Sequence, residues 1–208
     1  MRTLILFGLS LFSLSAQAAP HGEFSLEAGS LENNDRAYDL FNWGYTMPSQ
    51  GVRAGIKFHD RFTAIGSWSH TGVGATVTSF EEESDNSFET ALFMETFFAG
   101  VKADVNVRGF FYPYATAQVA TAFTTMVLDD DTSVAGNAGE VRASGIMPGV
   151  HGSIGAELRT PEGFIPWGLQ VAFYVDVGLT HLGKASFEPM GDMGAGGVTY
   201  RSGLGVRF

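Results

Sequence analysis

One segment limits the possible folds more than any other, because between residues 167 and 179 every second side chain is large and apolar. The run comprises Trp167, Leu169, Val171, Phe173, Val175, Val177 and Leu179. A helix face repeats about every 3.6 residues, whereas strand side chains alternate between two faces, so the pattern predicts a β-strand. The strand is longer than the about 5–6 residues usual in soluble sheets and suits a tilted crossing of a bilayer.

Seven further segments repeat this alternation: 24–29, 52–59, 62–68, 97–104, 111–123, 150–159 and 200–208. The total of eight is even, as single-chain bacterial membrane barrels require. Only 16% of the residues are charged, against about 25% in soluble domains. No run after residue 18 approaches the length of a membrane-spanning helix. The sequence therefore predicts an all-β fold, an eight-stranded antiparallel up-and-down transmembrane β-barrel.

The expected connections alternate in length, which independently favours such a barrel. Tight turns are expected at Asp60–Arg61, Val105–Gly109 and Thr160–Ile165, and long loops at 32–49, 72–92, 127–145 and 183–197. Outer-membrane barrels have short periplasmic turns and longer extracellular loops. We expect one barrel domain over residues 19–208, with both termini in the periplasm. A soluble secreted β protein is the alternative.

Residues 1–18 are expected to be a secretory signal peptide, cleaved after Ala18. Arg2 provides the positive start, a short apolar core follows, and Ala16 and Ala18 frame the cleavage site. The apolar core is too short to span a bilayer as a helix. The predicted location is the bacterial outer membrane.

The face opposite the apolar residues holds mostly Gly, Ser and Thr with spaced charges, and we expect it to line the lumen. The predicted polar lumen network is Glu27, Arg53, Lys57, Lys102, Asp104, Glu157, Arg159, Asp176, Arg201 and Arg207. Charges in a narrow interior must pair or stay hydrated. They would form either a salt-bridge network that rigidifies the barrel or a polar conduit for small solutes or ions.

Aromatic residues gather near the expected strand ends, as in the girdles of membrane barrels. The periplasmic set is Phe58, Phe62, Phe110, Phe111, Tyr112, Tyr114, Phe164 and Trp167, and the loop-side set is Trp43, Tyr45, Trp68 and Phe123. The expected long loops are acidic, and divalent cations could bridge them to lipid phosphates. The candidate cation contacts are Glu81, Glu82, Glu83, Asp129, Asp130 and Asp131.

No metal-binding or phosphate-binding motif is present, and we expect neither a metal nor a cofactor. The net charge of −10 argues against a nucleic-acid partner. One candidate catalytic pair is His151 and Ser153, on one face of a strand. It resembles the His-x-Ser pair of outer-membrane lipid A deacylases. That family's pair faces the membrane and is followed by Asn, whereas this pair is expected inside and Ile154 follows it, so we expect no enzyme.

The last strand carries a sequence signal that resembles the C-terminal β-signal of outer-membrane proteins, with Arg201, Gly203, Val206 and Phe208 in its four defined positions. The resemblance implies recognition by the barrel-assembly machinery. Together with Phe111-Tyr-Pro-Tyr114, it makes residues 22–208 similar to the small eight-stranded barrels of the OmpA-like and OmpW-like type. We expect a monomer that contacts outer-membrane lipid and lipopolysaccharide. Its expected role is structural or surface interaction, with a narrow channel as the alternative and a lipid A-modifying hydrolase as the weaker one.

Overall fold

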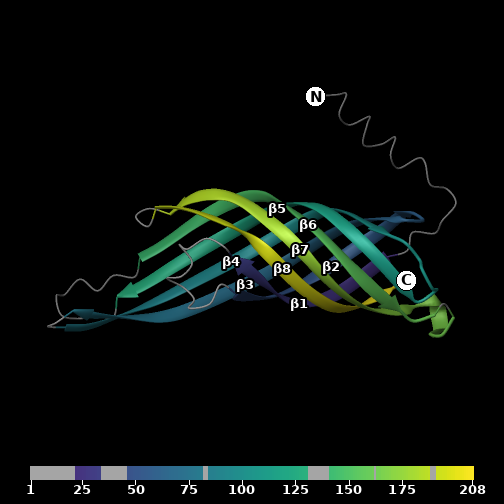
Figure 1. Cartoon of the computed structure of the whole chain (residues 1–208), viewed down its shortest axis with the longest axis horizontal. Helices are drawn as coiled ribbons and strands as arrows, with labels where there is room; N and C mark the ends of the chain where they lie inside the picture. Colours follow the sequence, from purple (N-terminus) through teal and green to yellow (C-terminus); the bar gives the residue numbers. More distant parts are fainter. Residues whose placement is uncertain (1–21, 34–45, 82–83, 131–140, 162, 188–190) are drawn as a thin grey trace, which may run out of the picture.

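The computed structural model of the chain describes residues 22–33, 46–81, 84–130, 141–161, 163–187 and 191–208. Eight antiparallel strands pair in sequence order and β8 pairs with β1, which closes the barrel (Figure 1). The strands are β1 (Gly22–Asn33), β2 (Thr46–His59), β3 (Phe62–Glu81), β4 (Ser84–Asp104), β5 (Phe111–Asp130), β6 (Val141–Arg159), β7 (Gln170–Phe187) and β8 (Gly191–Arg207). The predicted eight-stranded antiparallel barrel is therefore confirmed.

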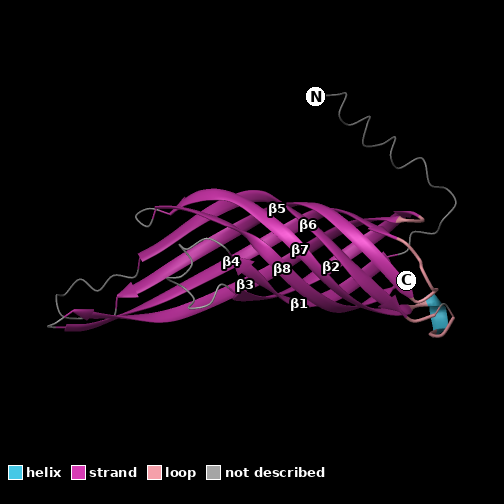
Figure 2. Ribbon diagram, viewed as in Figure 1, coloured by secondary structure: helices cyan, strands magenta, loops and turns pink. Residues whose placement is uncertain are grey.

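In the described part of the chain, no helix has the length and apolar character needed to cross a membrane. A 3-10 turn, η2 (Pro166–Gly168), precedes β7 (Figure 2). The predicted signal peptide and its cleavage point after Ala18 lie outside the described residues.

Three short connections meet at one end of the barrel, which we call the short-turn end. Residues 60–61, 105–110 and 160–169 join β2 to β3, β4 to β5 and β6 to β7. Gly22 also lies there, because it pairs with Ile56 near the end of β2. Phe208 lies beside it, since the two backbones exchange hydrogen bonds of 2.7 and 3.0 Å. The predicted start of one strand at Trp167 is wrong. Trp167 has a φ of 67° and Gly168 a φ of 73°, and this left-handed backbone cannot continue a strand.

The predicted long loops at the other end are largely wrong. The strands continue through residues 72–81, 84–92, 127–130, 141–145, 183–187 and 191–197. They project as hairpins, of which β3 and β4 reach farthest at the left of Figure 1, and we call this the hairpin end. The β3–β4 ladder runs without a break from Phe62↔Ala103 to Glu81↔Ser84. Of the 32–49 loop, residues 34–45 lie outside the described part.

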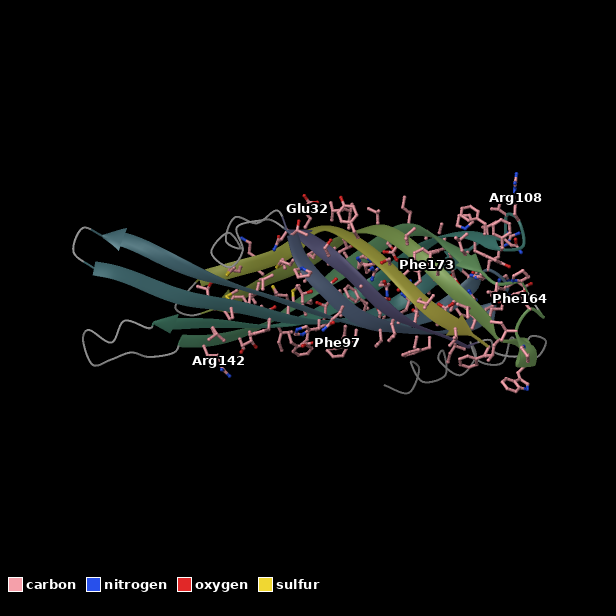
Figure 3. All side chains as sticks on the ribbon, turned by 90° about the horizontal axis from the view of Figure 1, so that it is seen from below. Glu32, Phe97, Arg108, Arg142, Phe164 and Phe173 are labelled. Carbon is pink, nitrogen blue, oxygen red and sulfur yellow. The ribbon has the colours of Figure 1, made fainter. Side chains whose placement is uncertain are left out.

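The apolar face of the strands points outward, as predicted. On β7, Val175 is 48% exposed, while its neighbour Asp176 is 3% exposed and faces the lumen. Large apolar side chains cover the outer wall of the short-turn half, and we call them the apolar belt. Figure 3 shows two of them, Phe97 and Phe173. The belt comprises Phe24, Leu26, Ile56, Phe58, Phe62, Phe97, Val101, Val119, Phe123, Ile146, Val150, Ile154, Leu158, Phe173, Val175, Val177, Leu179, Tyr200, Leu204 and Val206.

Toward the hairpin end the two faces exchange their polarity, so that polar side chains point outward and apolar side chains point inward. On β6, exposed Ile146 is followed outward by exposed Ser144 and Arg142, while Met147 and Ala143 face inward and are buried. In the same way β7 places exposed Lys184 outside and buried Leu182 inside. An outer wall that is polar and an interior that is apolar is the arrangement of a barrel in water. The strands thus carry two opposite patterns, one after the other.

Candidate functional site

The lumen brings together ten charged side chains, five acidic and five basic, none with more than 10% of its side chain exposed. Nine of them belong to the predicted polar network. They fall into two groups. The central ion cluster is Glu27, Arg53, Asp176 and Arg201, and the mouth ion cluster, nearer the short-turn end, is Glu23, Lys102, Asp104, Glu157, Arg159 and Arg207. Each cluster is electrically neutral by itself.

Asp176 is the hub of the central ion cluster. Its carboxylate accepts hydrogen bonds from Tyr114 Oη at 2.9 Å, Arg201 Nε at 3.0 Å and Arg53 Nη2 at 3.2 Å. Arg53 Nε also lies 2.7 Å from Glu27 Oε1, and the Arg53 guanidinium lies 4.4 Å from the centre of the Tyr174 ring. A buried charge is tolerated only when it is paired and hydrogen-bonded, and this arrangement provides both.

His151 extends the central ion cluster toward the hairpin end. Its Nε2 lies 2.6 Å from Arg201 Nη2 and its Nδ1 lies 2.8 Å from Thr180 Oγ1. A guanidinium can only donate, so Nε2 accepts and the imidazole is neutral with its proton on Nδ1. Ser153 bonds instead to Thr116, with 2.7 Å between the two hydroxyl oxygens. The pair suggested as catalytic is thus buried in the lumen and engaged with different partners.

The mouth ion cluster centres on Glu157. This carboxylate meets Arg159 Nε at 2.9 Å, Arg207 Nη1 at 3.1 Å and Lys102 Nζ at 3.3 Å. Lys102 is held from the other side by both oxygens of Glu23 at 2.6 Å. Arg159 and Arg207 both contact Asp104 as well. The pairs connect β1, β4, β6 and β8, so the cluster links strands that are not neighbours in the sheet.

Lys57 is the one predicted network residue that the structure leaves out of these clusters. It is half-buried at the short-turn end and has no acidic partner among the described residues. Glu23, which the prediction missed, supplies the balancing charge instead. A signal was available, since Glu23 shares the odd-numbered face of β1 with Ser25 and Glu27.

Two tyrosines were also misjudged. Tyr114 was expected in the periplasmic girdle but is 5% exposed and bonds to Asp176 inside the barrel. Tyr112 is half-buried, and the guanidinium of Arg159 lies 3.5 Å from the centre of its ring. Phe164 and Trp167 are 74% and 92% exposed, in keeping with the girdle. Trp43 and Tyr45 lie outside the described residues.

Beyond His151 the lumen is filled by apolar side chains, which we call the apolar plug. Its members are Leu31, Met47, Leu92, Met94, Phe98, Ala120, Ala122, Met126, Ala143, Met147, Leu182, Phe187, Met193 and Ala195. Met side chains are flexible and fill irregular space, which suits a plug built from seven of the eight strands, with Val73 of β3 packed against it. Cavities of about 30 and about 20 Å³ remain between the plug and the ion clusters and among the charges. Each has room for one or two water molecules.

The four residues of the proposed assembly signal divide between the two faces of β8. Arg201 and Gly203 face the lumen, and a side chain at position 203 would lie 2.5 Å from the Tyr174 ring. Val206 and Phe208 are 41% and 58% exposed on the outside. Packing against Tyr174 therefore requires glycine at position 203, independently of any recognition by the assembly machinery.

The structure does not test the predicted cation contacts. Glu82, Glu83 and Asp131 lie outside the described residues, and the backbones of Glu81, Asp129 and Asp130 lie in β3 and β5. Among the side chains that the structure describes, no group of three or more His, Asp or Glu residues is placed to hold a metal ion.

Sequence comparisons give no relative, because neither a family model nor a curated protein matches the chain. Structure comparison finds Ail, the attachment invasion locus protein of Yersinia pestis, with a TM-score of 0.51 and 13% identity over 92% of this chain and 100% of Ail. Neisserial surface protein A has a TM-score of 0.49 and 12% identity over 89% of this chain and 95% of its own. The likeness to Ail confirms the predicted resemblance to small outer-membrane barrels at the level of the fold.

Proposed function

We propose that this chain is a bacterial outer-membrane barrel that acts through its surfaces, in envelope structure or in contacts outside the cell, and does not conduct solutes. The apolar belt supports the location, because soluble proteins rarely expose so large a continuous apolar surface. Ail is named for attachment and invasion, and a surface role of that general kind fits a barrel with a closed lumen.

The packed lumen is the observation that carries this proposal. A solute would have to separate ion pairs at 2.6–3.3 Å in both clusters and then pass the apolar plug, whose members are at most 9% exposed. Separating a buried pair leaves uncompensated charges in the lumen, which is strongly unfavourable. The narrow-channel alternative needs several such openings at once.

The change from an apolar to a polar outer wall supports the expected orientation and partners. We propose that the short-turn end faces the periplasm and that the apolar belt contacts lipid, with lipopolysaccharide around the polar outer wall that follows it. Recognition of Val206 and Phe208 by the assembly machinery belongs to this proposal, since both side chains are accessible on the outside of β8. We further propose that the barrel is a monomer.

Gel mobility with and without boiling, after outer-membrane fractionation, tests the location and the closed barrel. We expect a heat-modifiable band in the outer-membrane fraction, because closed barrels resist unfolding by detergent until heated. A periplasmic protein that stays in solution without detergent and shows no shift would contradict the proposal.

Planar-bilayer recording separates a closed barrel from a channel. We expect no unitary conductance from the folded protein, because both ion clusters and the apolar plug block the lumen. Reproducible channel steps that disappear on boiling would support the channel instead. Lipid A acylation in cells with and without Ser153→Ala checks the enzyme alternative, and we expect no difference because Ser153 is 5% exposed inside the lumen.

A further inference from the structure

The short-turn end holds a cavity of about 660 Å³ that opens outward below the mouth ion cluster. We call it the mouth cavity. Small-molecule sites are typically about 300–1,000 Å³, so its size suits a ligand. Its lining comes from six strands and all three short turns. Phe164 and Arg108, labelled at this end in Figure 3, mark the turns around it.

The floor of the cavity is made of guanidinium groups that are already held in place. Arg159 lies against the Tyr112 ring, and Tyr112 Oη accepts a hydrogen bond of 3.0 Å from Asn106 Nδ2. Arg207 is fixed through its Nη1, which meets Glu157 at 3.1 Å and Glu23 at 3.3 Å. Side chains locked by such contacts lose little freedom when a ligand binds, which favours affinity.

The wall adds cations that lack acidic partners. Lys57 and Arg61 both line the cavity, and neither forms an ion pair with any residue that the structure describes. Asp104 also lines it, but this carboxylate is occupied by Arg159 and Arg207. Asp60 and Phe208 also line the cavity, and the carboxylate of Asp60 partly offsets its positive charge. The donors that remain for a ligand are therefore mainly cationic and amide groups.

We propose that the mouth cavity binds a small anionic molecule through its carboxylate or phosphate groups, with Lys57 and Arg61 as its direct contacts. Arg and Lys donate charge-assisted hydrogen bonds to both kinds of group. In the proposed orientation the ligand enters from the periplasm. That direction rests on the proposed function, whereas binding itself does not, because the cavity is present in the folded barrel wherever it resides.

Isothermal titration of the detergent-folded protein with citrate, and separately with inorganic phosphate, tests the site. We expect saturable binding of at least one anion, and the anion bound identifies the chemistry. Lys57→Gln should weaken binding at least about tenfold, because it removes a charge-assisted hydrogen bond to the anion. Arg61→Gln should act in the same direction, and added NaCl should weaken binding by the wild type.

The matched control is Lys184→Gln, which removes one exposed lysine of β7 near the hairpin end and should leave binding unchanged. Heat-modifiable gel mobility confirms that each variant is folded, which is expected because Lys57 and Arg61 lie outside both ion clusters. The proposal is overturned if neither anion binds saturably at millimolar concentration. It is equally overturned if the folded Lys57→Gln and Arg61→Gln proteins bind as the wild type does.

Discussion

Replacing Asp176 by Asn tests whether the ion clusters hold the barrel together. Asn keeps the shape of the side chain but removes the charge that Arg53 and Arg201 approach at 3.2 and 3.0 Å. The central ion cluster would then hold two guanidinium groups against Glu27 alone, and Arg201 lies 3.8 Å from that carboxylate. Removing one member of a buried pair costs about 3–5 kcal/mol, which lowers the ratio of folded to unfolded barrel by roughly two to nearly four orders of magnitude.

The assay is reversible urea unfolding in lipid vesicles or detergent, followed by heat-modifiable gel mobility. Asp192→Asn is the matched control, because Asp192 is exposed on β8 and its change should cost no more than about 0.5 kcal/mol. The double variant Asp176→Asn with Arg201→Gln restores neutrality and should lose less than the two single losses combined. A loss below about 1 kcal/mol in Asp176→Asn would refute the argument that paired charges stabilise the lumen.

Three further perturbations probe the rest of the wall. Val175→Arg places a charge in the middle of the apolar belt and should destabilise the bilayer-inserted barrel by about 2–4 kcal/mol. Ser186→Arg, on the outer face of the same strand near the hairpin end, should change little, and equal urea midpoints would contradict the proposed membrane level. Met126→Ala empties a position of the apolar plug that is 0% exposed and should cost about 2–5 kcal/mol in the same unfolding assay. Phe208→Ala should reduce the amount of protein in the outer membrane without changing the urea midpoint of refolded protein, and a lowered midpoint with normal insertion would assign Phe208 to stability instead.

The strands that span the apolar belt could be predicted from the sequence because one physical rule governs them. Outward positions must be apolar in lipid and inward positions must fit a narrow interior, so a run such as Val171 to Leu179 shows period two over its whole length. The short connection at Asp60 and Arg61 could also be predicted, because only a tight turn fits between two such strands. The break before β7 at Trp167 could not be predicted in this way, because the left-handed backbone of a non-glycine residue does not change the alternation of side chains.

The partners inside the lumen could be predicted only in part. Alternation tells which side chains face inward, and it placed Arg53 and Asp176 together in one interior. It does not tell which of them meet, because Arg53 on β2 reaches Asp176 on β7 across 123 residues of sequence. That contact depends on closure of the barrel and on the stagger of its strands. The same dependence decides that Glu23 pairs with Lys102 while Lys57 stays outside the clusters.

The strands near the hairpin end escaped prediction because the alternation does not stop there but changes phase. Once the outer wall leaves lipid, polar residues such as Ser144 and Lys184 face outward, and apolar residues such as Met147 and Leu182 turn inward. A prediction that requires apolar outward and polar inward positions therefore assigns this stretch to a loop. The requirement for backbone hydrogen bonding continues in water, however, and burying Met and Leu in the plug favours extending the hairpins.

In the proposed membrane location, the change of phase also marks where the barrel meets the edge of the bilayer. On the outer face, Trp68 is followed by His70, and Phe97 is followed by Glu95 on the neighbouring strand. His70 and Glu95 are directly opposite in the ladder, and Nδ1 of the imidazole lies 2.6 Å from the carboxylate. A charge on the lipid face is costly at the middle of the bilayer but nearly free at the interface. In the proposed membrane location this pair lies near the outer edge of the apolar surface on β3 and β4, where Phe93, 45% exposed, is the next outward-facing residue of β4. The apolar plug lies inside the barrel from about this level outward.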